Sequence, residues 1–431
     1  MKYKINTEIS LFNTYDVVVC GGGFAGFGAA VMAAKEGAKV LLIERTSGLG
    51  GMGFIGGVGN ICYKGNVVTN GYPFDTMISL MKKMKAYGPE NDYPQIINEK
   101  YGTQDNLFDH NMLPIVLQYI TNIHKVDLLY HTEVIDIIKC KDKIKYVIIH
   151  NASGTQAIKA EVFIDATGNG IVAMHAGCKT LNDDEFYPDM LKSSTLMFLR
   201  KVDLNQKQEV LDEAYCDPKI DIPKIQLFYE ADDKISYKVH SNISYDTTTG
   251  KGLSDLERDM RDKIPAFIRY FQENISDKYK YDYSPQVIGF REGKRILGDQ
   301  ILTSEDIKTH RKFDDAIAYG NFTIDTVYAR ENIDYYQIPR SSILAKDLVN
   351  LFVVGRCLSA DRGAMSTARI MATCCLMGSS AGINAALAVK KHKNIRTIKT
   401  KDVVDILIKD SLDKDFMREK LSKSTQNTSA K

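Results

Sequence analysis

The sequence lacks an excess of charge of either sign and lacks any long apolar run. Its 56 basic and 54 acidic side chains leave a formal net charge of +2, so nothing favours nucleic acid as a partner. No run reaches the ~18 apolar residues of a membrane span, and the N-terminus has no signal-peptide pattern. We therefore expect a cytoplasmic protein with no membrane span and a small-molecule substrate.

Clustered metal ligands are also absent. The eight cysteines include no CxxC pair and no group at iron–sulfur or zinc spacing, and the eight histidines include no HxxxH or HxH pair. A metal site is not expected. Cys374 and Cys375 are neighbours, but adjacent residues of a helix point about 100° apart, which favours two core positions over a redox pair.

The length of 431 residues exceeds what one hydrophobic core supports and suits one large or two intimate domains around an internal cofactor site. Short buried-strand patterns occur near the N-terminus, at Val162–Asp165 and again at 350–355. The stretch between about 180 and 335 is more polar and aromatic. We therefore expect two distant parts of the chain to build one nucleotide domain around an inserted region.

The first ordered unit reads as strand, turn, helix and strand. Tyr15–Cys20 is rich in valine, 27–36 is rich in alanine, and 39–44 has a wholly apolar centre. Such a unit forms a parallel sheet with a right-handed crossover.

The turn in this unit, Gly21-Gly22-Gly23-Phe24-Ala25-Gly26, fits the dinucleotide motif GxGxxG. Gly21 suits a tight turn, Gly23 leaves room for a pyrophosphate, and Gly26 lets the helix lie close to the strand. Glu44 ends the second strand, where a carboxylate accepts hydrogen bonds from ribose hydroxyls and disfavours a 2′-phosphate. The fingerprint predicts NAD or FAD without deciding between them.

Further motifs resemble the glutathione-reductase-type FAD superfamily and, within it, bacterial single-chain FAD-dependent oxidoreductases, over roughly residues 15–390. The family's loop after the acidic clamp is matched from Glu44-Arg45 to Gly50-Gly51-Met52-Gly53. The resemblance implies that this loop follows the ribose, pyrophosphate and ribitol of FAD. It also implies that the backbone at Val134 meets the adenine.

Two later motifs extend the resemblance. Ala166-Thr167-Gly168 is similar to the family's second FAD-contacting turn, although Asn169 stands where an aspartate is usual. Asn350 to Cys357, which includes Gly355 and Arg356, is similar to the motif that reaches the flavin end. The helix starting near Ala372-Thr373-Cys374 is then expected to direct its N-terminus at the isoalloxazine, with Gly378 and Gly382 allowing close packing.

Arginines are the candidates for substrate binding because a guanidinium presents a rigid fork suited to carboxylates. Arg291 lies in a segment that resembles one beside the family's active site, and Arg369 precedes the flavin-directed helix. We predict these two as catalytic-site residues, although a structural ion pair is an equal alternative for each. For Arg295 and Arg362 the ion pair is favoured.

Other groups near the expected cofactor are assigned to packing. His175, soon after the second turn, is expected to pack a helix. The candidate proton donors are three tyrosines for which interface packing is the default, namely Tyr245, Tyr335 and Tyr336.

Together these features predict an α/β, Rossmann-like three-layer FAD-binding domain with an inserted α+β cap. The predicted divisions are 1–180 with 336–395 for the FAD-binding domain, 181–335 for the cap and 396–431 for a C-terminal helix and tail. The predicted activity is two-electron hydride transfer between flavin N5 and a small organic substrate. Alternatives are an NAD-dependent dehydrogenase and a non-catalytic flavin-binding redox sensor. The substrate, electron acceptor or donor, flavin attachment and homo-oligomer formation are left open.

Overall fold

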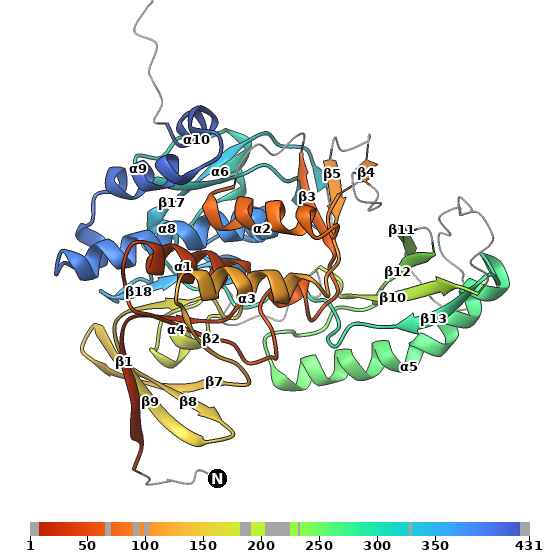
Figure 1. Cartoon of the computed structure of the whole chain (residues 1–431), viewed down its shortest axis with the longest axis horizontal. Coiled ribbons are helices and arrows are strands. Elements are labelled where there is room, and N and C mark those ends of the chain that lie inside the picture. Colours follow the sequence, from red (N-terminus) through yellow and green to blue (C-terminus); the bar gives the residue numbers. More distant parts are fainter. Residues whose placement is uncertain are drawn as a thin grey trace, which may run out of the picture.

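The fold is built around one mixed sheet (Figure 1). The computed structural model describes residues 8–64, 70–88, 95–98, 103–181, 191–202, 225–231, 233–326 and 330–422. Within them, the largest sheet has the strand order β6-β2-β1-β9-β8-β7, with β18 also paired to β9. Its strands are β1 (Ser10–Cys20), β2 (Val40–Ile43), β6 (Asp127–Leu129), β7 (Glu133–Cys140), β8 (Lys143–Asn151), β9 (Gly154–Asp165) and β18 (Leu351–Val353).

The predicted strand–helix–strand unit is present. β1 and β2 run parallel, with Val17 opposite Val40, and α1 (Phe24–Lys35) crosses between them. All four residues of β2 are buried, as expected for a central parallel strand covered on both faces. The apolar runs of the sequence therefore become the middle of the sheet.

β9 differs from the prediction. The sequence shows a buried-strand pattern here only at Val162–Asp165, but the strand has 12 residues and begins at Gly154. Lys159 and Glu161 are exposed and Ala160 is buried, so the alternation of a half-buried strand precedes that segment. β1 pairs parallel along nearly all of β9. On the other side of β9, its first part pairs antiparallel with β8 and its last residues pair parallel with β18.

Helices α1, α2 (Tyr72–Lys83), α3 (Leu113–Ile123) and α8 (Met371–Lys390) gather on one side of this sheet (Figure 1). α8 is long and apolar enough to cross a membrane by length and composition, but 94% of that stretch is buried inside the fold. It lies against α1, where a Cβ atom at Gly378 or Gly382 would overlap with the carbonyl oxygen of Ala25 or Ala29. The predicted close packing at these two glycines is confirmed.

A second sheet extends away from the first (Figure 1). Its strand order is β11-β12-β10-β13, and α5 (Gly250–Asn274) packs on one face through a core that includes Tyr237 and Phe271. The strands are β10 (Ser194–Lys201), β11 (Ile225–Ala231), β12 (Lys234–His240) and β13 (Tyr279–Tyr283). This sheet and α5 are called the cap below.

Smaller elements complete the described chain. The strands are β3 (Asn60–Lys64), β4 (Gln95–Asn98), β5 (Thr103–Leu107), β14 (Ala316–Gly320), β15 (Ile324–Asp325), β16 (Arg330–Glu331) and β17 (Tyr336–Pro339). The helices are α4 (Ile171–His175), α6 (Ser304–Lys308), α7 (Arg362–Ala368), α9 (Thr400–Asp410) and α10 (Lys414–Leu421), with 3-10 turns at Gly51–Gly53, Arg340–Ser342, Gly355–Cys357 and Ile395–Thr397.

The predicted α/β Rossmann-like fold class is confirmed, whereas the predicted domain limits stay predictions. Apolar side chains of β14 and β17, such as Ile317 and Ile338, belong to the same core as α1 and α8. The packing therefore favours a cap that ends nearer residue 300 than 335.

Candidate active site

The turn after β1 has the backbone that its glycines predict. Gly21 has φ +106°, a conformation that side-chain-bearing residues rarely adopt, and a Cβ atom at Gly26 would overlap with the Gly21 carbonyl oxygen. Gly23 differs, because a Cβ there would meet only the Gly51 Cα atom, at 3.9 Å. Gly21 and Gly26 thus serve the fold, while Gly23 leaves open space. Phe24 and Ala25 are buried in the first turn of α1, so their backbone rather than their side chains faces the turn.

Glu44 closes this turn from the second strand. Its carboxylate is buried and accepts hydrogen bonds from the Gly22 N–H (2.7 Å), the Thr46 N–H (2.8 Å) and the Thr46 hydroxyl (2.8 Å). Arg45, which follows it, is exposed. The Glu44 carboxylate is therefore fixed beside the glycine turn, with lone pairs left for a ribose.

A further predicted segment, the loop 50–52, contacts the glycine turn. Gly50 donates its N–H to the Gly22 carbonyl (2.8 Å), and a Cβ at Gly51 would lie 3.1 Å from the Gly23 Cα. Met52 extends in the other direction and packs against the core of the cap. The loop 50–52 thus connects the glycine turn with the cap.

Val134 lies on β7, opposite Ile149 and half-buried. Its strand is joined to the acidic clamp by backbone hydrogen bonds from Thr132 to the Glu44 carbonyl (3.1 Å) and from His131 to the Thr46 carbonyl (3.2 Å). The structure therefore brings the predicted adenine-side strand next to Glu44.

The second turn follows β9. Ala166 donates its N–H to the Cys20 carbonyl (2.8 Å), which holds the turn against the end of β1. Asp165 is buried and accepts from the Thr167 hydroxyl (2.7 Å) and from the Ala173 N–H (3.0 Å) of α4. Burial is the largest cause raising the pKa of Asp165, and these hydrogen bonds counter it. Asp165 was not predicted as a site residue, and it shapes the turn that Gly168 (φ +76°) completes.

Two segments late in the sequence, around Gly355 and at the start of α8, lie next to α1. Gly355 has φ +82°, and a Cβ there would lie 3.1 Å from the Ala25 Cβ and 4.0 Å from the Cys374 sulfur. Thr373 and Cys374 are buried in the first turn of α8, and burial raises the pKa of the Cys374 thiol to about 12. Residues 355 and 374 are therefore neighbours of α1, although they lie more than 300 positions later in the sequence.

Arg356 connects the second turn with the cap. Its guanidinium donates to the Gly168 carbonyl (3.0 Å), the Asn169 side-chain oxygen (3.2 Å) and the Phe290 carbonyl (3.1 Å), and it lies 4.4 Å from the Phe290 ring centroid. Burial is the main cause lowering the pKa of Arg356 to about 10.

Two helix N-termini converge here without a capping side chain. Neither α1 nor α8 has a side-chain cap hydrogen bond or an acidic residue in its first turn. The first N–H groups of a helix need a partner and carry a partial positive charge, so an uncapped end suits an anionic or electron-rich ligand. The residues around them, among them Gly21, Gly23 and Gly51, stay partly accessible.

The two predicted catalytic arginines differ in their surroundings. Arg291 donates to the Lys192 carbonyl (2.7 Å) and lies 3.5 Å from the Ser194 hydroxyl, at the start of β10. Arg369 ends α7 and is largely buried; its ion pair with Asp325 is long (3.8 Å), and its Nε has no hydrogen-bond partner in the described structure. Burial lowers the pKa of Arg369, and Asp325 opposes this. Arg369 therefore retains unused donor capacity.

The other two arginines have structural contacts. Arg295 donates to the Ala360 carbonyl (2.9 Å), and the Arg362 Nε lies 3.1 Å from the carboxylate of the buried Glu292. Both contacts hold the segment after the cap to the start of α7.

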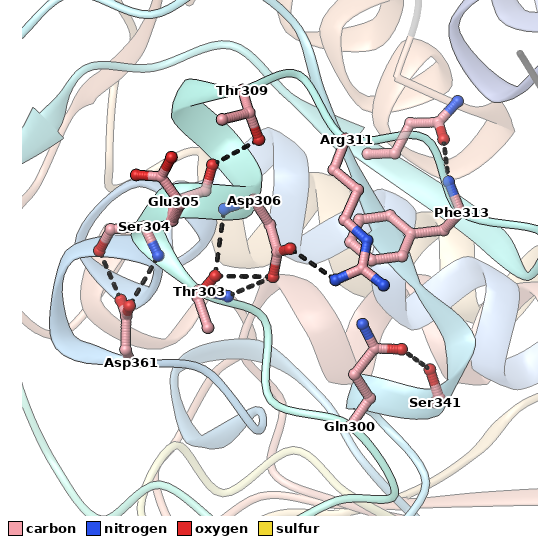
Figure 2. A network of polar contacts seen from close by, with 11 residues as sticks. Gln300, Thr303, Ser304, Glu305, Asp306, Thr309, Arg311, Phe313, Ser341 and Asp361 are labelled. Carbon is pink, nitrogen blue, oxygen red and sulfur yellow. Dashed lines mark hydrogen bonds and ion pairs between the residues drawn. The ribbon is translucent and has the colours of Figure 1, made fainter.

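The start of α7 is itself anchored by a polar network (Figure 2). Asp361 caps α7 by accepting from the Ala364 N–H (2.8 Å) and also accepts from the Ser304 N–H and hydroxyl, both at 2.6 Å. Thr303 and Asp306 form a capping box on α6, and Arg311 donates to Asp306 (2.8 Å). Since α7 leads directly to Arg369, this network anchors the start of the helix that carries this residue at its end.

The candidate proton donors pack against other side chains, which is the role expected for them by default. Tyr336 is buried with its hydroxyl 3.1 Å from that of Thr367, and Tyr335 packs edge-on against Tyr319. Burial raises the pKa of Tyr336 and of Tyr245. His175 is half-exposed and lies 3.6 Å from Asp136.

A different polar cluster lies where the loop that begins at Gly51 meets the cap. The Tyr283 hydroxyl is 3.0 Å from His110 Nε2 and accepts from Lys234 Nζ (3.0 Å). The Phe198 ring stacks against those of His110 and Tyr283 at 4.8 and 4.5 Å, and the His110 and Tyr283 rings lie 5.7 Å from each other. A Cβ at Gly57 would lie 3.2 Å from Phe198, so the loop that begins at Gly51 reaches this cluster. We call these three polar residues the His110–Tyr283–Lys234 cluster.

Burial and Lys234 lower the pKa of His110 to about 4, so the imidazole is neutral near pH 7. No sequence motif indicates this cluster, since His110 and Tyr283 are 173 residues apart.

A parallel sheet, a glycine turn at a helix N-terminus and an acidic ribose clamp define the class of dinucleotide-binding oxidoreductases. Residues 16–407 match the family described as FAD dependent oxidoreductase. The chain belongs to this family, it is an enzyme, and its cofactor is FAD. The two uncapped helix ends and the open space at Gly23 fit that cofactor.

The solved structures that this chain is similar to are distant in sequence. A geranylgeranyl bacteriochlorophyll reductase-like protein from Thermoplasma acidophilum is 16% identical with a TM-score of 0.52, and the match covers 97% of this chain and 94% of that one. The p-nitrophenol 4-monooxygenase of Pseudomonas putida is 10% identical with a TM-score of 0.49, covering 92% and 86%. The first of these likenesses supports the fold alone.

Proposed function

We propose that the enzyme transfers two electrons, as a hydride, between flavin N5 and a small organic substrate that carries a carboxylate or carbonyl group. The observation that carries this proposal is Arg369, a largely buried guanidinium with unused donors that directly precedes the uncapped N-terminus of α8. Bound FAD supplies the hydride chemistry. Arg369 orients the substrate, and the fixed start of α7 keeps the guanidinium in place.

The His110–Tyr283–Lys234 cluster is the proposed route for the proton that accompanies hydride transfer. Tyr283 holds a hydroxyl proton between a neutral imidazole and an ammonium group, so it can give a proton and be supplied with another. This role as a proton route is supported by the location of the cluster, where loop 50–60 meets the cap.

Several broader assignments are proposals of the same kind. The order of motifs supports membership of the glutathione-reductase-type superfamily, with β7 and β8 as its antiparallel addition to the parallel sheet. A cytoplasmic location and the discontinuous FAD-binding domain are proposed with it. With FAD as the cofactor, an NAD-dependent dehydrogenase is no longer favoured.

The test is an anaerobic screen in which small carboxylic acids and carbonyl compounds are added to the oxidised and the photoreduced holoenzyme while flavin absorbance is followed. A compound that changes the flavin spectrum is then compared between the wild type and Arg369→Gln. Losing a charge-assisted pair costs about 1.5–3 kcal/mol, so we expect KM to rise roughly 10-fold or more.

Arg258→Gln is the matched control, because Arg258 is an exposed arginine on α5. Equal KM values in the wild type and Arg369→Gln would contradict the proposed substrate site. A holoenzyme that photoreduces normally but reacts with no compound of this class would favour the redox-sensor alternative.

A further inference from the structure

Helix α3 lies at the surface and contains no charged residue, since its sequence is LPIVLQYITNI. One face is buried in the core and includes Val116 and Ile120. On the opposite face Ile115 is 57% exposed, Tyr119 53% and Ile123 54%, and their spacing of four residues places them in one stripe along the helix. The solvent side of a surface helix normally carries charged or polar residues. A stripe of large apolar side chains therefore indicates an interaction surface.

Lysines flank the first end of this stripe. Met84, itself 45% exposed, follows α2 and lies in the sequence among the exposed residues Lys82, Lys83 and Lys85. The Ala86 carbonyl accepts the N–H of Asp109 (3.0 Å), which joins this basic segment to the chain just before α3. Since α2 and α3 also lie on the same side of the main sheet (Figure 1), the lysines are next to the start of the stripe.

The other end of the stripe is also basic, because Lys125 is exposed just after α3. In the parts of the chain that the structure describes, Lys125 forms no ion pair, and neither do lysines 83 and 85. The acidic residues nearest to α3 in the sequence are engaged: Asp109 accepts the Asn111 N–H (2.8 Å), and Asp127 accepts from the Tyr15 hydroxyl. The surroundings of the stripe are therefore mainly positive.

We propose that this surface docks on an anionic lipid bilayer. The surface consists of the stripe and Met84 with the flanking lysines 82, 83, 85 and 125, and we call it the α3 surface. The apolar side chains of a helix that lies in the plane of the membrane enter the boundary between headgroups and acyl chains. Basic residues beside them are attracted to anionic headgroups. Charge complementarity thus favours an acidic lipid surface as the partner.

A second copy of the chain fits this surface less well. If two α3 helices paired antiparallel about a twofold axis, Lys125 of one copy would approach Lys85 of the other. If they paired parallel, the two Lys125 side chains would meet. Like charges brought together across an interface oppose association in both arrangements.

The α3 surface lies directly outside the loop that contacts the glycine turn. A Cβ atom at Gly50 or Gly53 would lie 2.7 or 3.0 Å from the Leu113 side chain, so the buried face of α3 packs on this loop. Docking would bring the loop to about 10 Å from the bilayer, the diameter of one helix. The inference does not depend on which substrate the enzyme takes.

The test is flotation of the FAD-loaded full chain with vesicles of equal parts phosphatidylcholine and phosphatidylglycerol, and with vesicles of phosphatidylcholine alone. We expect the protein to bind the anionic vesicles at least about 10-fold more tightly than the neutral ones, and added salt to weaken binding. Two double variants, Ile115→Ser with Tyr119→Ser and Lys83→Gln with Lys85→Gln, are each expected to weaken binding to anionic vesicles at least about 10-fold.

Leu412→Ser with Lys414→Gln is the matched control, because it removes an exposed apolar residue and an exposed lysine near α10. Flavin absorbance and melting temperature show that each variant folds and retains FAD. Wild-type protein that stays with neither kind of vesicle would overturn the inference, as would equal binding by the wild type and both α3-surface variants. A lipid-free dimer that Ile115→Ser with Tyr119→Ser converts to a monomer would also overturn it, because a second copy would then cover this surface.

Discussion

At the scale of single residues, two glycines of the same turn have opposite roles. A side chain at Gly26 collides with the protein, whereas one at Gly23 enters space that the protein leaves open, and Gly23 has an ordinary φ of −68°. Gly26 is therefore required by the fold, and Gly23 by the ligand.

This contrast gives a prediction for alanine variants. Gly23→Ala is expected to change the free energy of unfolding of the apo protein by less than about 0.5 kcal/mol while weakening FAD binding at least about 10-fold. Gly26→Ala is expected to destabilise the apo protein by roughly 1–3 kcal/mol, because the added methyl group overpacks a tight contact. Urea unfolding of the apo proteins and FAD titration measure the two effects, and a Gly23→Ala protein that binds FAD normally would contradict the assignment.

The glycine and acidic residues of the site could be predicted because each satisfies a local backbone or charge requirement. Gly21 needs a positive φ, and Glu44 needs only to end the next strand. His110 and Tyr283 could not be predicted, since their contact depends on how the cap packs against loop 50–60. Arg291 stays a predicted substrate ligand, and the structure adds its hydrogen bond to the Lys192 carbonyl, just before β10.

At the scale of elements, the pair α1 and α8 determines the site's geometry. Both begin at the site without a side-chain cap, and glycines at their crossing allow backbone contact. Small residues spaced four apart made this contact predictable. α5 was not predicted, because Gly250, Gly252 and Pro265 all lower helix propensity, and packing on the cap sheet outweighs that.

Gly378→Ala tests the crossing. The new methyl group would overlap with the Ala25 carbonyl oxygen, so we expect a loss of about 3 kcal/mol in the free energy of unfolding, measured by urea denaturation. Gly250→Ala is the control, because nothing lies within 4 Å of its added Cβ and a helical alanine stabilises by up to about 1 kcal/mol relative to glycine. Equal stabilities of the two variants would show that the helices separate without cost.

At the scale of the whole molecule, His110 makes the docking of the cap sensitive to acid. The folded protein protonates His110 only near pH 4, whereas the unfolded chain does so near 6.5. Below pH 6.5 the unfolded state therefore binds more protons, and stability falls as the pH decreases toward 4. The stability that depends on a neutral His110 is fully present above pH 6.5.

Between pH 7.5 and 5.0 this one group is expected to reduce the free energy of unfolding by about 2 kcal/mol. Urea unfolding at both pH values should show the loss in the wild type and a smaller one in His110→Gln. His150→Gln, at an exposed position, should behave as the wild type. The same pH dependence in all three proteins would contradict a buried neutral His110.

The pairing of β18 with β9 has a consequence for synthesis of the chain. Leu351 lies opposite Phe163, so 188 residues must be made between the two halves of this contact. At a translation rate of roughly 5–20 residues per second this takes about 10–40 s. During that interval the nascent chain carries the glycine turn and the acidic clamp but neither Arg356 nor α8. We therefore expect FAD to load only after α8 has been synthesised.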